Sequence, residues 1–338
     1  MATQDIFPVA GIDIGGTKIA VCLADSTGRI IDSKRIKGGT QQPYKTKLPE
    51  LEHMIHACCK AGGISLKDVR ACGVSAPGPL DIPGGTILKT PNMVWADVPI
   101  RDDLARRLGI PVILQNDANG GALAEWFFGA ARGCSNFVYL TMSTGIGGGI
   151  VTADRLVDGC AGNAGELGHI VLDLNGPECG CGMRGCFEAF CSGRNVQKRL
   201  QDLVRGTPEH PLLRQPEVDG DPSKLRFETL REAAARQVPE ACELWDEICL
   251  RMAQGIGIQM MTFNPELIIL GTIFYYAGDM LMTPVKECLK RFAWSQMREP
   301  CRLELPGLGE KIGELAGIAV ALYGLHQRGA WQRPVHSS

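Results

Sequence analysis

Hydrophobic positions follow two periodicities along this chain, one typical of β-strands and one typical of α-helices. Residues 9–23 are apolar around a glycine turn, and residues 29–34 continue beyond a second turn, which together predict a β-hairpin. Residues 48–61 have helical spacing and residues 69–75 are strand-like. This alternation predicts an α/β fold with a parallel or mixed sheet.

The second half of the chain begins like the first, with strands predicted at residues 137–142 and 148–152 on either side of another glycine turn. Residues 195–263 then have mainly helical spacing, and 267–270 form a short buried strand. A helix rich in small residues is expected at 312–325. The similarity between the halves is weak, but it favours two related lobes with a cleft between them, where ligands usually bind.

Length and charge narrow the classes of protein to which the chain can belong. At 338 residues it is about twice as long as an average domain, in agreement with two lobes. Its 35 Lys and Arg residues nearly balance 37 Asp and Glu residues, without the basic excess of a nucleic-acid-binding protein. We find no signal-peptide pattern and no run of about 18 apolar residues. We therefore expect a cytoplasmic protein that binds neither nucleic acid nor a membrane.

Cysteine usage points to the same compartment. The chain has 14 cysteines, which would indicate disulfides in a small secreted domain. Here most of them stand singly in apolar segments of a long chain, so we expect buried thiols in a reducing compartment. The exceptions are Cys179, Cys181 and Cys186, which stand close together.

The segment Asp13-Ile14-Gly15-Gly16-Thr17-Lys18 places a glycine turn between the first two predicted strands. Glycines let backbone N–H groups approach phosphate oxygens, while Thr17 and Lys18 could add a hydroxyl and a cation. The spacing is neither that of a P-loop nor that of the dinucleotide fingerprint. On its own the segment is compatible with a plain structural turn as well as with a phosphate site.

A second glycine turn, Ser143-Thr144-Gly145-Ile146-Gly147-Gly148-Gly149, also follows an apolar strand directly. Two turns of phosphate size in matching contexts argue against chance. Paired glycine hairpins, one in each lobe, clamp the nucleotide phosphates in the actin and hexokinase superfamily, and the two turns resemble that arrangement.

Between the two turns, Gln115-Asn116-Asp117-Ala118-Asn119 follows the apolar run 112–114 and precedes a helix expected to start near Gly121. A carboxylate at the carboxyl end of a strand projects into the ligand-binding edge of an α/β fold. Such a segment alone is more often a helix N-cap or a turn, but the flanking phosphate turns favour Asp117 as a general base. A weak base suffices for phosphoryl transfer, where positioning and charge neutralisation by Mg²⁺ dominate.

The most specific pattern combines three cysteines with an upstream histidine. Three thiolates and one imidazole supply the four ligands of a closed tetrahedral zinc site, and the intervening glycines permit the tight turn of a C-x-C pair. The alternative is a group of unligated buried thiols. The expected ligands of this structural zinc are His169, Cys179, Cys181 and Cys186.

Glu166, His169 and Glu188 bracket the expected zinc loop, so folding of the loop around a metal would bring the three side chains together. The carboxylates can accept hydrogen bonds from substrate hydroxyl groups. A histidine bound to zinc through one ring nitrogen can donate its other N–H. We therefore expect these residues to bind a sugar.

Taken in order, these motifs resemble the motif series of the ROK sugar kinases (repressors, open reading frames, kinases), from about residue 9 to about residue 325. The resemblance implies an α/β fold with two ribonuclease-H-like lobes of the actin and hexokinase type and a zinc-stabilised loop in the second lobe. We expect a small N-terminal lobe at 1–116, rejoined by the helix near 313–330, and a large lobe at 117–312. The family resemblance also favours a homodimer.

The family pattern further implies that ATP and Mg²⁺ are bound and that Asp117 is the catalytic base. The implied nucleotide contacts are Gly15, Gly16, Thr17, Lys18, Thr144, Gly145 and Gly271. The implied sugar contacts are Asn92, Asn116, Asp117, Glu166, His169 and Glu188.

Residues 73–79 and 90–95 are similar to the sugar-side segments of the family's glucokinases, in which the Asn aligned with Asn92 contacts the sugar. Glucose is therefore the first choice of substrate. Kinases for N-acetylmannosamine, N-acetylglucosamine, fructose and allose share the framework, and a few loop residues worth about 1–3 kcal/mol apiece could distinguish them.

One segment departs from the family pattern. After the strand at 267–270 the chain reads Gly271-Thr272, whereas the family usually has two glycines, so Thr272 could alter nucleotide affinity or donor choice.

Two other classes of function are alternatives to a sugar kinase. A ROK repressor carries a helix-turn-helix ahead of the kinase-like body, and we expect none here because the first hairpin begins within about ten residues of Met1. A silent sugar-binding protein would not need the base, the turns and the carboxylates together.

Overall fold

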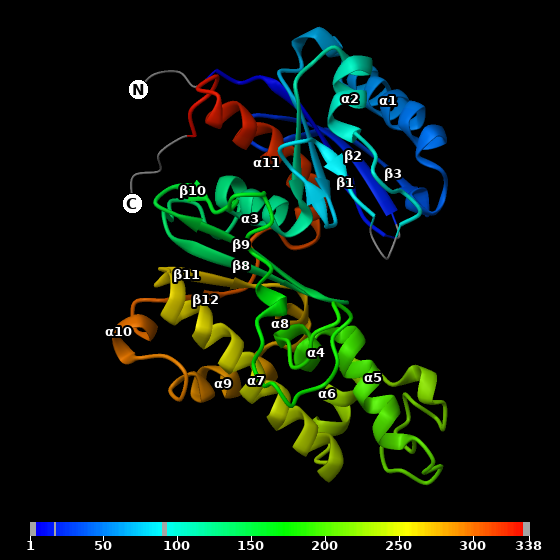
Figure 1. Ribbon diagram of the computed structural model, residues 1–338, viewed down its shortest axis with the longest axis vertical. Coiled ribbons are helices and arrows are strands. Elements are labelled where there is room, and N and C mark those ends of the chain that lie inside the picture. The colour runs from blue at the N-terminus through cyan, green and yellow to red at the C-terminus, as the bar shows by residue number, and fades with distance from the viewer. Residues whose placement is uncertain (1–4, 17, 90–92, 334–338) are drawn as a thin grey trace. The chain divides into compact units, whose positions relative to one another are not determined.

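Both glycine turns lie in five-stranded sheets, one in each half of the chain (Figure 1). The computed structural model describes residues 5–16, 18–89 and 93–333. The chain forms two compact units, each of which is described separately. Unit 1 comprises Met1–Ser135, Gly149–Gly165 and Pro306–Ser338, and unit 2 comprises Asn136–Gly148 and Glu166–Leu305.

The first sheet belongs to unit 1. Its strands, in spatial order, are β3 (Ile30–Lys37), β2 (Lys18–Asp25), β1 (Pro8–Ile14), β4 (Cys72–Ala76) and β7 (Val112–Asn116). β1, β4 and β7 are parallel, whereas β1, β2 and β3 form antiparallel hairpins. The carboxyl ends of parallel strands meet at one edge. The register therefore places Asp13 beside Ser75 and Ser75 beside Gln115.

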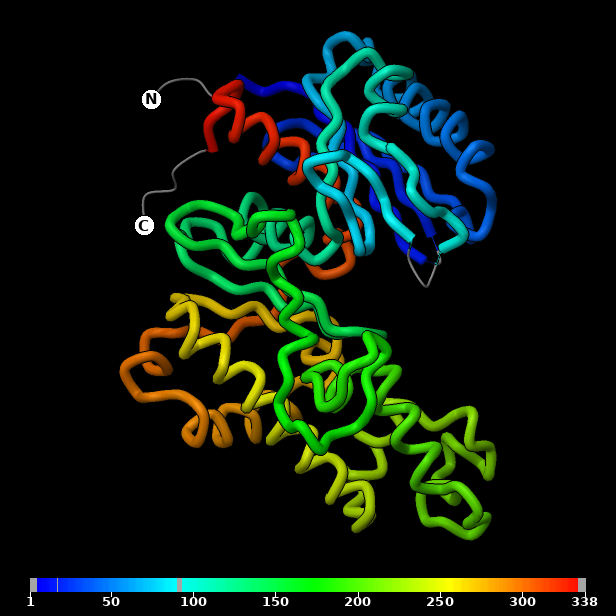
Figure 2. Tube along the Cα trace, viewed as in Figure 1, coloured from blue at the N-terminus to red at the C-terminus, as the bar shows by residue number. Residues whose placement is uncertain are grey.

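Helices cover both faces of the first sheet. α1 (Tyr44–Ala61) and α2 (Ile100–Leu108) bury their apolar residues in a core with Ile12 and Val74. α11 (Ile312–Gln327) packs on β1 and β4, and Figure 2 shows this last helix (red) beside the first strand (blue). Because Ile12 and its neighbour Gly11 point to opposite faces of a strand, the small residue faces α11.

The crossing of α11 over the sheet depends on glycine. A Cβ on Gly73 would lie 2.0 Å from the carbonyl oxygen of Gly317, and a Cβ on Gly11 would lie 2.6 Å from the amide nitrogen of Ile318. Helix and strands therefore meet backbone to backbone. This close contact explains why the predicted helix at 312–325 is rich in small residues.

The second sheet holds the second glycine turn. Its strands, in spatial order, are β10 (Arg155–Leu156), β9 (Ile146–Thr152), β8 (Phe137–Met142), β11 (Leu267–Leu270) and β12 (Arg302–Glu304). β8, β11 and β12 are parallel, and the glycine turn joins β8 to β9. The division between the units falls within β9.

The remaining elements are mostly helical and belong largely to unit 2, where the long α7 contacts α4, α6 and α9. Their bounds are α3 (Asp117–Phe128), α4 (Phe187–Cys191), α5 (Gly193–Val204), α6 (Phe227–Ala235), α7 (Pro239–Phe263), α8 (Thr272–Ala277), α9 (Asp279–Leu289) and α10 (Ser295–Arg298). Short pieces are β5 (Leu80–Asp81), β6 (Thr86–Ile87), η1 (Gly39–Gln41), η2 (Leu66–Asp68), η3 (Leu167–His169), η4 (Pro222–Lys224) and η5 (Gly309–Lys311).

Helix α3 starts earlier than the hydrophobic pattern predicts. It begins at Asp117 and not near Gly121, because the side chain of Asn116 caps it by accepting a hydrogen bond from the Ala118 N–H (2.9 Å). Gly120 weakens the local helix signal, but it lets the helix approach Ser75, 3.1 Å from where a Cβ would stand. α3 packs against α11 and so groups with unit 1, whereas the sequence-based division placed residues 117–312 in the large lobe.

A wholly buried carboxylate in α3 holds the segment with which the chain returns to unit 1. Glu125 accepts hydrogen bonds from the backbone N–H groups of Ala130 (2.7 Å), Gly307 (3.0 Å) and Leu308 (3.1 Å). Backbone N–H donors can stabilise a buried carboxylate without a basic partner. This side chain therefore fixes residues 307–308 against α3.

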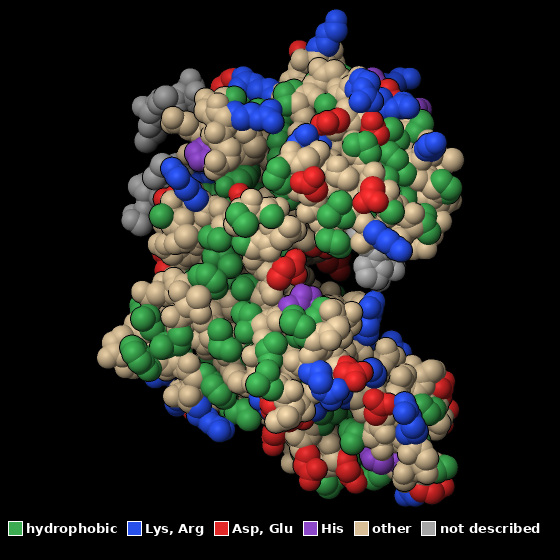
Figure 3. Space-filling view, in the orientation of Figure 1, with side chains coloured by type: hydrophobic (Ala, Val, Ile, Leu, Met, Phe, Trp, Pro, Cys, Tyr) green, Lys and Arg blue, Asp and Glu red, His purple; other side chains and the backbone are tan. Residues whose placement is uncertain are grey.

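Surface and cysteine properties agree with the composition. In Figure 3, basic and acidic side chains are interspersed over the visible face. All 14 cysteines lie in the described part of the chain and all are free thiols, most of them buried, as predicted. No helix among residues 5–16, 18–89 and 93–333 is both long and apolar enough to span a membrane.

Candidate functional site

The first glycine turn lies beside a partly buried carboxylate, Asp13, at the end of β1. The Ser75 hydroxyl donates a hydrogen bond to Asp13 Oδ1 (3.0 Å). Burial raises the pKa of the Asp13 carboxyl to about 6; the Ser75 hydrogen bond opposes this rise, the charge of Asp117 adds to it, and Lys18 opposes it. A cation at this place would favour the ionised form of Asp13.

The turn itself is held from two sides. The Gly15 N–H donates to the Lys18 carbonyl oxygen (2.9 Å), which closes the hairpin. The buried Thr40 hydroxyl donates to the Gly16 carbonyl oxygen (3.0 Å). The role of Thr40 could not be predicted from the sequence, because a single threonine in a polar loop has no distinguishing pattern.

Asp117 stands at the first position of α3, directly after β7. Its neighbour Asn116 is the helix cap, and the Ala118 N–H lies within 2.8 Å of Asp117 Oδ1 as well. The side chain of Asp117 is exposed, whereas Ala118 behind it is buried. The residue is thus anchored by its backbone while its carboxylate stays accessible, as a proton acceptor for an external hydroxyl group requires.

A buried amide network supports this strand end. Gln115 accepts hydrogen bonds through Oε1 from the Asn116 N–H (2.8 Å) and from Asn119 Nδ2 (3.2 Å). Its Nε2 donates to Asp158 Oδ1 (2.8 Å), and burial raises the pKa of Asp158. Asp158 is more than 40 residues away in sequence, so no local motif could have linked it to Asn116.

The second glycine turn is closed by its own backbone, with the Ser143 N–H donating to the Gly145 carbonyl oxygen (2.9 Å). Thr144 is exposed at its tip. Glu188 accepts a hydrogen bond from the Ile146 N–H through Oε2 (2.8 Å). Glu188, expected to bind a sugar, is therefore also a structural partner of the turn.

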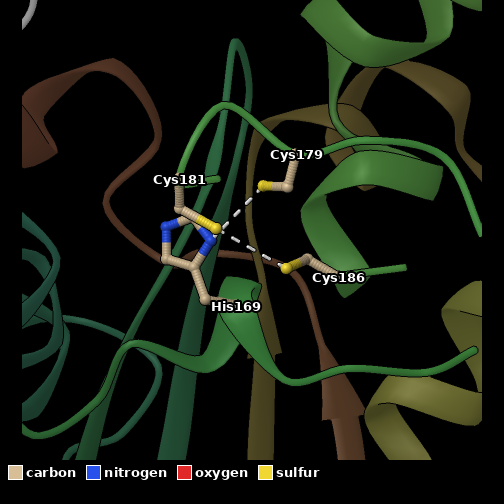
Figure 4. A group of neighbouring side chains, drawn as sticks. All are labelled: His169, Cys179, Cys181 and Cys186. Carbon is tan, nitrogen blue, oxygen red and sulfur yellow. Dashed lines mark hydrogen bonds between the residues drawn. The ribbon is translucent and has the colours of Figure 1, made fainter. Parts of the chain in front are cut away.

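The four predicted metal ligands converge within unit 2. Figure 4 shows His169 from η3 facing three cysteines of the loop before α4, and the four ligand atoms all lie within 4.8 Å of one another. Cys181 Sγ and Cys186 Sγ are 3.7 Å apart, and Cys179 Sγ is 3.6 Å from His169 Nδ1. A zinc–sulfur bond of about 2.3 Å implies sulfur separations of about 3.8 Å in a tetrahedron, so this donor set fits zinc. A disulfide would require about 2.05 Å.

The carboxylates expected to bind sugar flank this group. Glu166 precedes η3 and is exposed, and its carbonyl oxygen accepts a hydrogen bond from the His169 N–H (3.0 Å). Glu188 Oε1 lies 4.0 Å from Cys179 Sγ. Unit 2 therefore groups Glu166, His169 and Glu188 around the same loop.

A pocket of about 360 Å³ opens beside the second glycine turn, within unit 2. Thr272 and Ile273 of α8 form part of its wall. Gly271, expected to contact the nucleotide, is buried behind them, and its N–H donates to the Leu140 carbonyl oxygen (2.8 Å). The rest of the wall is rich in arginine, which suits an anionic ligand. The other lining residues are Ser143, Thr144, Gly193, Arg194, Gln197, Arg226, Phe227, Glu228, Arg231, Tyr276 and Ala277.

The predicted residues thus form one group in each unit. Gly15, Gly16, Lys18, Asn116 and Asp117 belong to unit 1, and the metal ligands, the carboxylates, Thr144, Gly145 and Gly271 belong to unit 2. Thr17 and Asn92 lie outside the described residues.

The order of these motifs is matched by a known family. The family model described as "ROK family" matches residues 9–322. The chain is a member of the ROK family. This membership was predicted from the motifs and is confirmed.

Characterised ROK proteins include both enzymes and regulators. The glucokinase of Thermotoga maritima is 33% identical over 278 residues, which cover 82% of this chain and 85% of that protein. The xylose repressor of Caldicellulosiruptor bescii is 27% identical over 94% of this chain and 79% of the repressor. Family membership alone therefore leaves the activity open.

A solved ROK structure supports the two-lobed α/β sugar kinase fold. The ROK glucokinase of Streptomyces griseus, in complex with glucose and AMPPNP, is 30% identical with a TM-score of 0.73. The match covers 93% of this chain and 99% of that one. The predicted fold class is confirmed at this level, while the zinc, the base and the individual sugar contacts stay predictions.

Proposed function

We propose that this ROK protein transfers the terminal phosphoryl group of ATP to a hydroxyl group of a hexose, with Asp117 as the base. The observation that carries the proposal is the exposed Asp117 carboxylate, close enough to the partly buried Asp13 to raise its pKa, at the sheet edge that holds the first glycine turn. A carboxylate so placed can accept a proton from an alcohol, and the turn suits phosphate oxygens.

In the proposed reaction, a sugar oxygen attacks the terminal phosphorus and its proton passes to Asp117. A new oxygen–phosphorus bond forms as the bond to the bridging oxygen of ADP breaks, and ADP leaves with that electron pair. The transition state is loose, so positioning and charge neutralisation contribute more than the strength of the base. An exposed carboxylate is therefore sufficient.

Mg²⁺ would accompany ATP and neutralise charge on its phosphates. Asp13 is the proposed partner of the ion, because a desolvated carboxylate with a raised pKa gains most from a nearby cation. Lys18 would add a positive charge at the same turn, as predicted from the sequence.

The arginine-rich pocket of unit 2 is the proposed nucleoside site, with the turn of Thr144 and Gly145 beside the phosphates. The AMPPNP in the Streptomyces griseus relative supports ATP as the donor. Thr272, where the family usually has glycine, lines this pocket and would contact the nucleoside. The neighbouring Gly271 would act through the backbone that it positions.

Glucose is the proposed substrate, supported by the glucokinases among the relatives. Other hexoses and N-acetylhexosamines remain alternatives. A structural zinc would hold the loop and orient the histidine. The proposed sugar contacts are Asn92, Asn116, Asp117, Glu166, His169 and Glu188.

A coupled ADP-release assay with glucose, fructose, allose, N-acetylglucosamine and N-acetylmannosamine tests the proposal. We expect turnover with glucose, and Asp117→Asn should lower kcat by about 100-fold or more while glucose binding, measured by calorimetry, persists. The surface variant Asp102→Asn serves as the control. Turnover with none of these sugars, together with intact sugar binding, would favour a silent binding protein.

Metal content gives a separate test. We expect one zinc ion per chain in protein purified without chelators, measured by inductively coupled plasma mass spectrometry, because the donor set fits a tetrahedral ion. Cys181→Ser should reduce this content. Less than about one ion per chain in the unmodified protein would contradict the site. The predicted homodimer can be examined on the same sample by light scattering.

A further inference from the structure

The segments that carry the metal ligands also contact the second glycine turn. η3, which ends at His169, packs so closely on the turn that a Cβ on Gly168 would lie 2.0 Å from the Ile146 carbonyl oxygen. A Cβ on Gly148 of the turn would lie 2.4 Å from the side chain of Leu167. Movement of η3 must therefore move the turn.

The second ligand segment reaches the turn through Glu188. α4 begins directly after the ligand Cys186, and Glu188 lies in its first turn. One carboxylate oxygen accepts a hydrogen bond from the Ile146 N–H (2.8 Å), and the other lies 4.0 Å from Cys179 Sγ. Glu188 thus spans the gap between the metal loop and the glycine turn.

The start of α5 completes the attachment. The N–H groups of Gly193 and Arg194 donate to the carbonyl oxygens of Ser143 (2.8 Å) and Thr144 (3.3 Å). All four residues line the arginine-rich pocket. The backbone that holds the turn in place is also the wall of the proposed nucleoside site.

We propose that Glu188 is a positioning residue that couples the metal site to nucleotide binding. An occupied metal site fixes η3 and α4, and these elements hold the turn of residues 143–149 in the conformation that receives ATP. The inference rests on the proposed function, because it requires that ATP bind at this turn. It differs from the expected role of Glu188, which is contact with the sugar.

Coupling between two binding sites is reciprocal. If the metal strengthens nucleotide binding, the nucleotide must strengthen metal binding by the same factor. A preorganised turn also loses less conformational freedom on binding than a loose one. Both effects can be measured without sugar and without turnover.

The first experiment measures AMPPNP binding by calorimetry in the absence of sugar, with zinc-loaded protein. Glu188→Ala should weaken binding by roughly ten-fold, because the Ile146 N–H loses its partner. Glu188→Gln keeps an acceptor oxygen and should stay within about two-fold of the unmodified protein. A residue that only contacts sugar would leave AMPPNP affinity unchanged in both variants, and that result would overturn the inference.

The second experiment measures zinc affinity by equilibrium competition with a coloured chelator, with and without AMPPNP. In the unmodified protein and in Glu188→Gln, saturating AMPPNP should strengthen zinc binding by roughly ten-fold, whereas Glu188→Ala should show a smaller effect. Equal zinc affinity with and without bound nucleotide in the unmodified protein would overturn the inference.

A pair of glycine variants tests the contact through η3. Gly168→Ala should weaken AMPPNP binding and zinc binding together, because its methyl group collides with the Ile146 carbonyl. Gly180→Ala lies in the same metal loop with open space around its Cβ and serves as the matched control. Equal behaviour of the two variants would contradict the coupling.

These results separate the inference from the function on which it rests. If zinc-loaded unmodified protein binds no AMPPNP, both the proposed nucleotide site and the coupling are wrong. If it binds AMPPNP with the same affinity in all variants, and zinc affinity is unaltered by AMPPNP, the kinase proposal stands and the coupling alone is wrong.

Discussion

The proposed role of Asp13 beside Mg²⁺ carries a cost in stability. Its burial beside the first glycine turn raises its pKa from 3.8 to about 6, against the hydrogen bond from Ser75. Near neutral pH the folded protein therefore holds a desolvated negative charge. That charge becomes favourable only when a cation or a phosphate-bound Mg²⁺ arrives.

The pH dependence of stability follows from this shift. Because the folded-state pKa is above the unfolded value, the protonated carboxyl stabilises the fold below about pH 4, and this contribution is lost as the pH rises through about 6. Asp13→Asn removes the titration. Relative to its effect at pH 4, the variant should gain up to about 3 kcal/mol in unfolding free energy at pH 8, measured by urea denaturation. A difference that is independent of pH would contradict this prediction.

At the residue scale, the positions that carry neighbouring motif residues could be predicted from the sequence. Cys179, Cys181 and Cys186 stand within eight residues and converge in the structure, and Asp117 directly follows a strand end, as expected. Their roles as metal ligands and base stay predictions. Thr40 and Asp158 could not be predicted, because each supports the site through a hydrogen bond to a distant segment. Such partners depend on the fold and leave no local spacing.

At the scale of elements, the contact between α11 and the first sheet depends on the absence of side chains. Gly73 in β4 faces Gly317 in α11 at a distance where no Cβ fits. Close approach of this kind buries backbone against backbone and leaves no room for compensation by rotamer changes.

Gly73→Ala should therefore destabilise unit 1 by about 3 kcal/mol, because the added methyl group would lie 2.0 Å from the Gly317 carbonyl oxygen. Urea denaturation gives the free energy. Gly180→Ala, whose Cβ meets nothing within 4 Å, should change it by less than about 0.5 kcal/mol. Similar stabilities of the two variants would show that α11 can shift without cost.

Strands surrounded by apolar runs were predicted closely, and β8 and β11 have the predicted bounds. α2 was missed because its sequence, IRDDLARRL, has only a few apolar positions among charges. The start of α3 was misplaced because its glycines obscure a helix that is set by the Asn116 cap and by packing on α11. Tertiary contacts override weak local propensity in these cases.

On the scale of the whole molecule, the chain leaves unit 1 and returns to it at Pro306. The side chain of Glu125 holds the first residues of the returning segment. Its carboxylate accepts three backbone hydrogen bonds, two of them from Gly307 and Leu308. Removal of these acceptors would leave buried N–H groups without partners.

Glu125→Gln should lower the unfolding free energy by about 2–4 kcal/mol. The amide NH₂ group of glutamine would face a backbone N–H group that donates to the carboxylate in the unmodified protein, so two donors would meet where a hydrogen bond stood. Hydrogen exchange should accelerate at the amides of Gly307 and Leu308. The control is Glu287→Gln, which affects only an exposed pair with Lys290 and should cost less than about 1 kcal/mol. Unchanged exchange at residues 307–308 would show that this carboxylate does not hold the segment.

The position of α11 on β1 and β4 has a consequence for synthesis of the protein. The strands of the first sheet are translated before unit 2, whereas α11, which packs on them, follows unit 2 in the sequence. Most of unit 2, by contrast, is one uninterrupted stretch, Glu166–Leu305, and can form its core while translation continues. We therefore expect the core of unit 2 to form before that of unit 1 is complete, in contrast to the usual N-terminal-first order of domain folding.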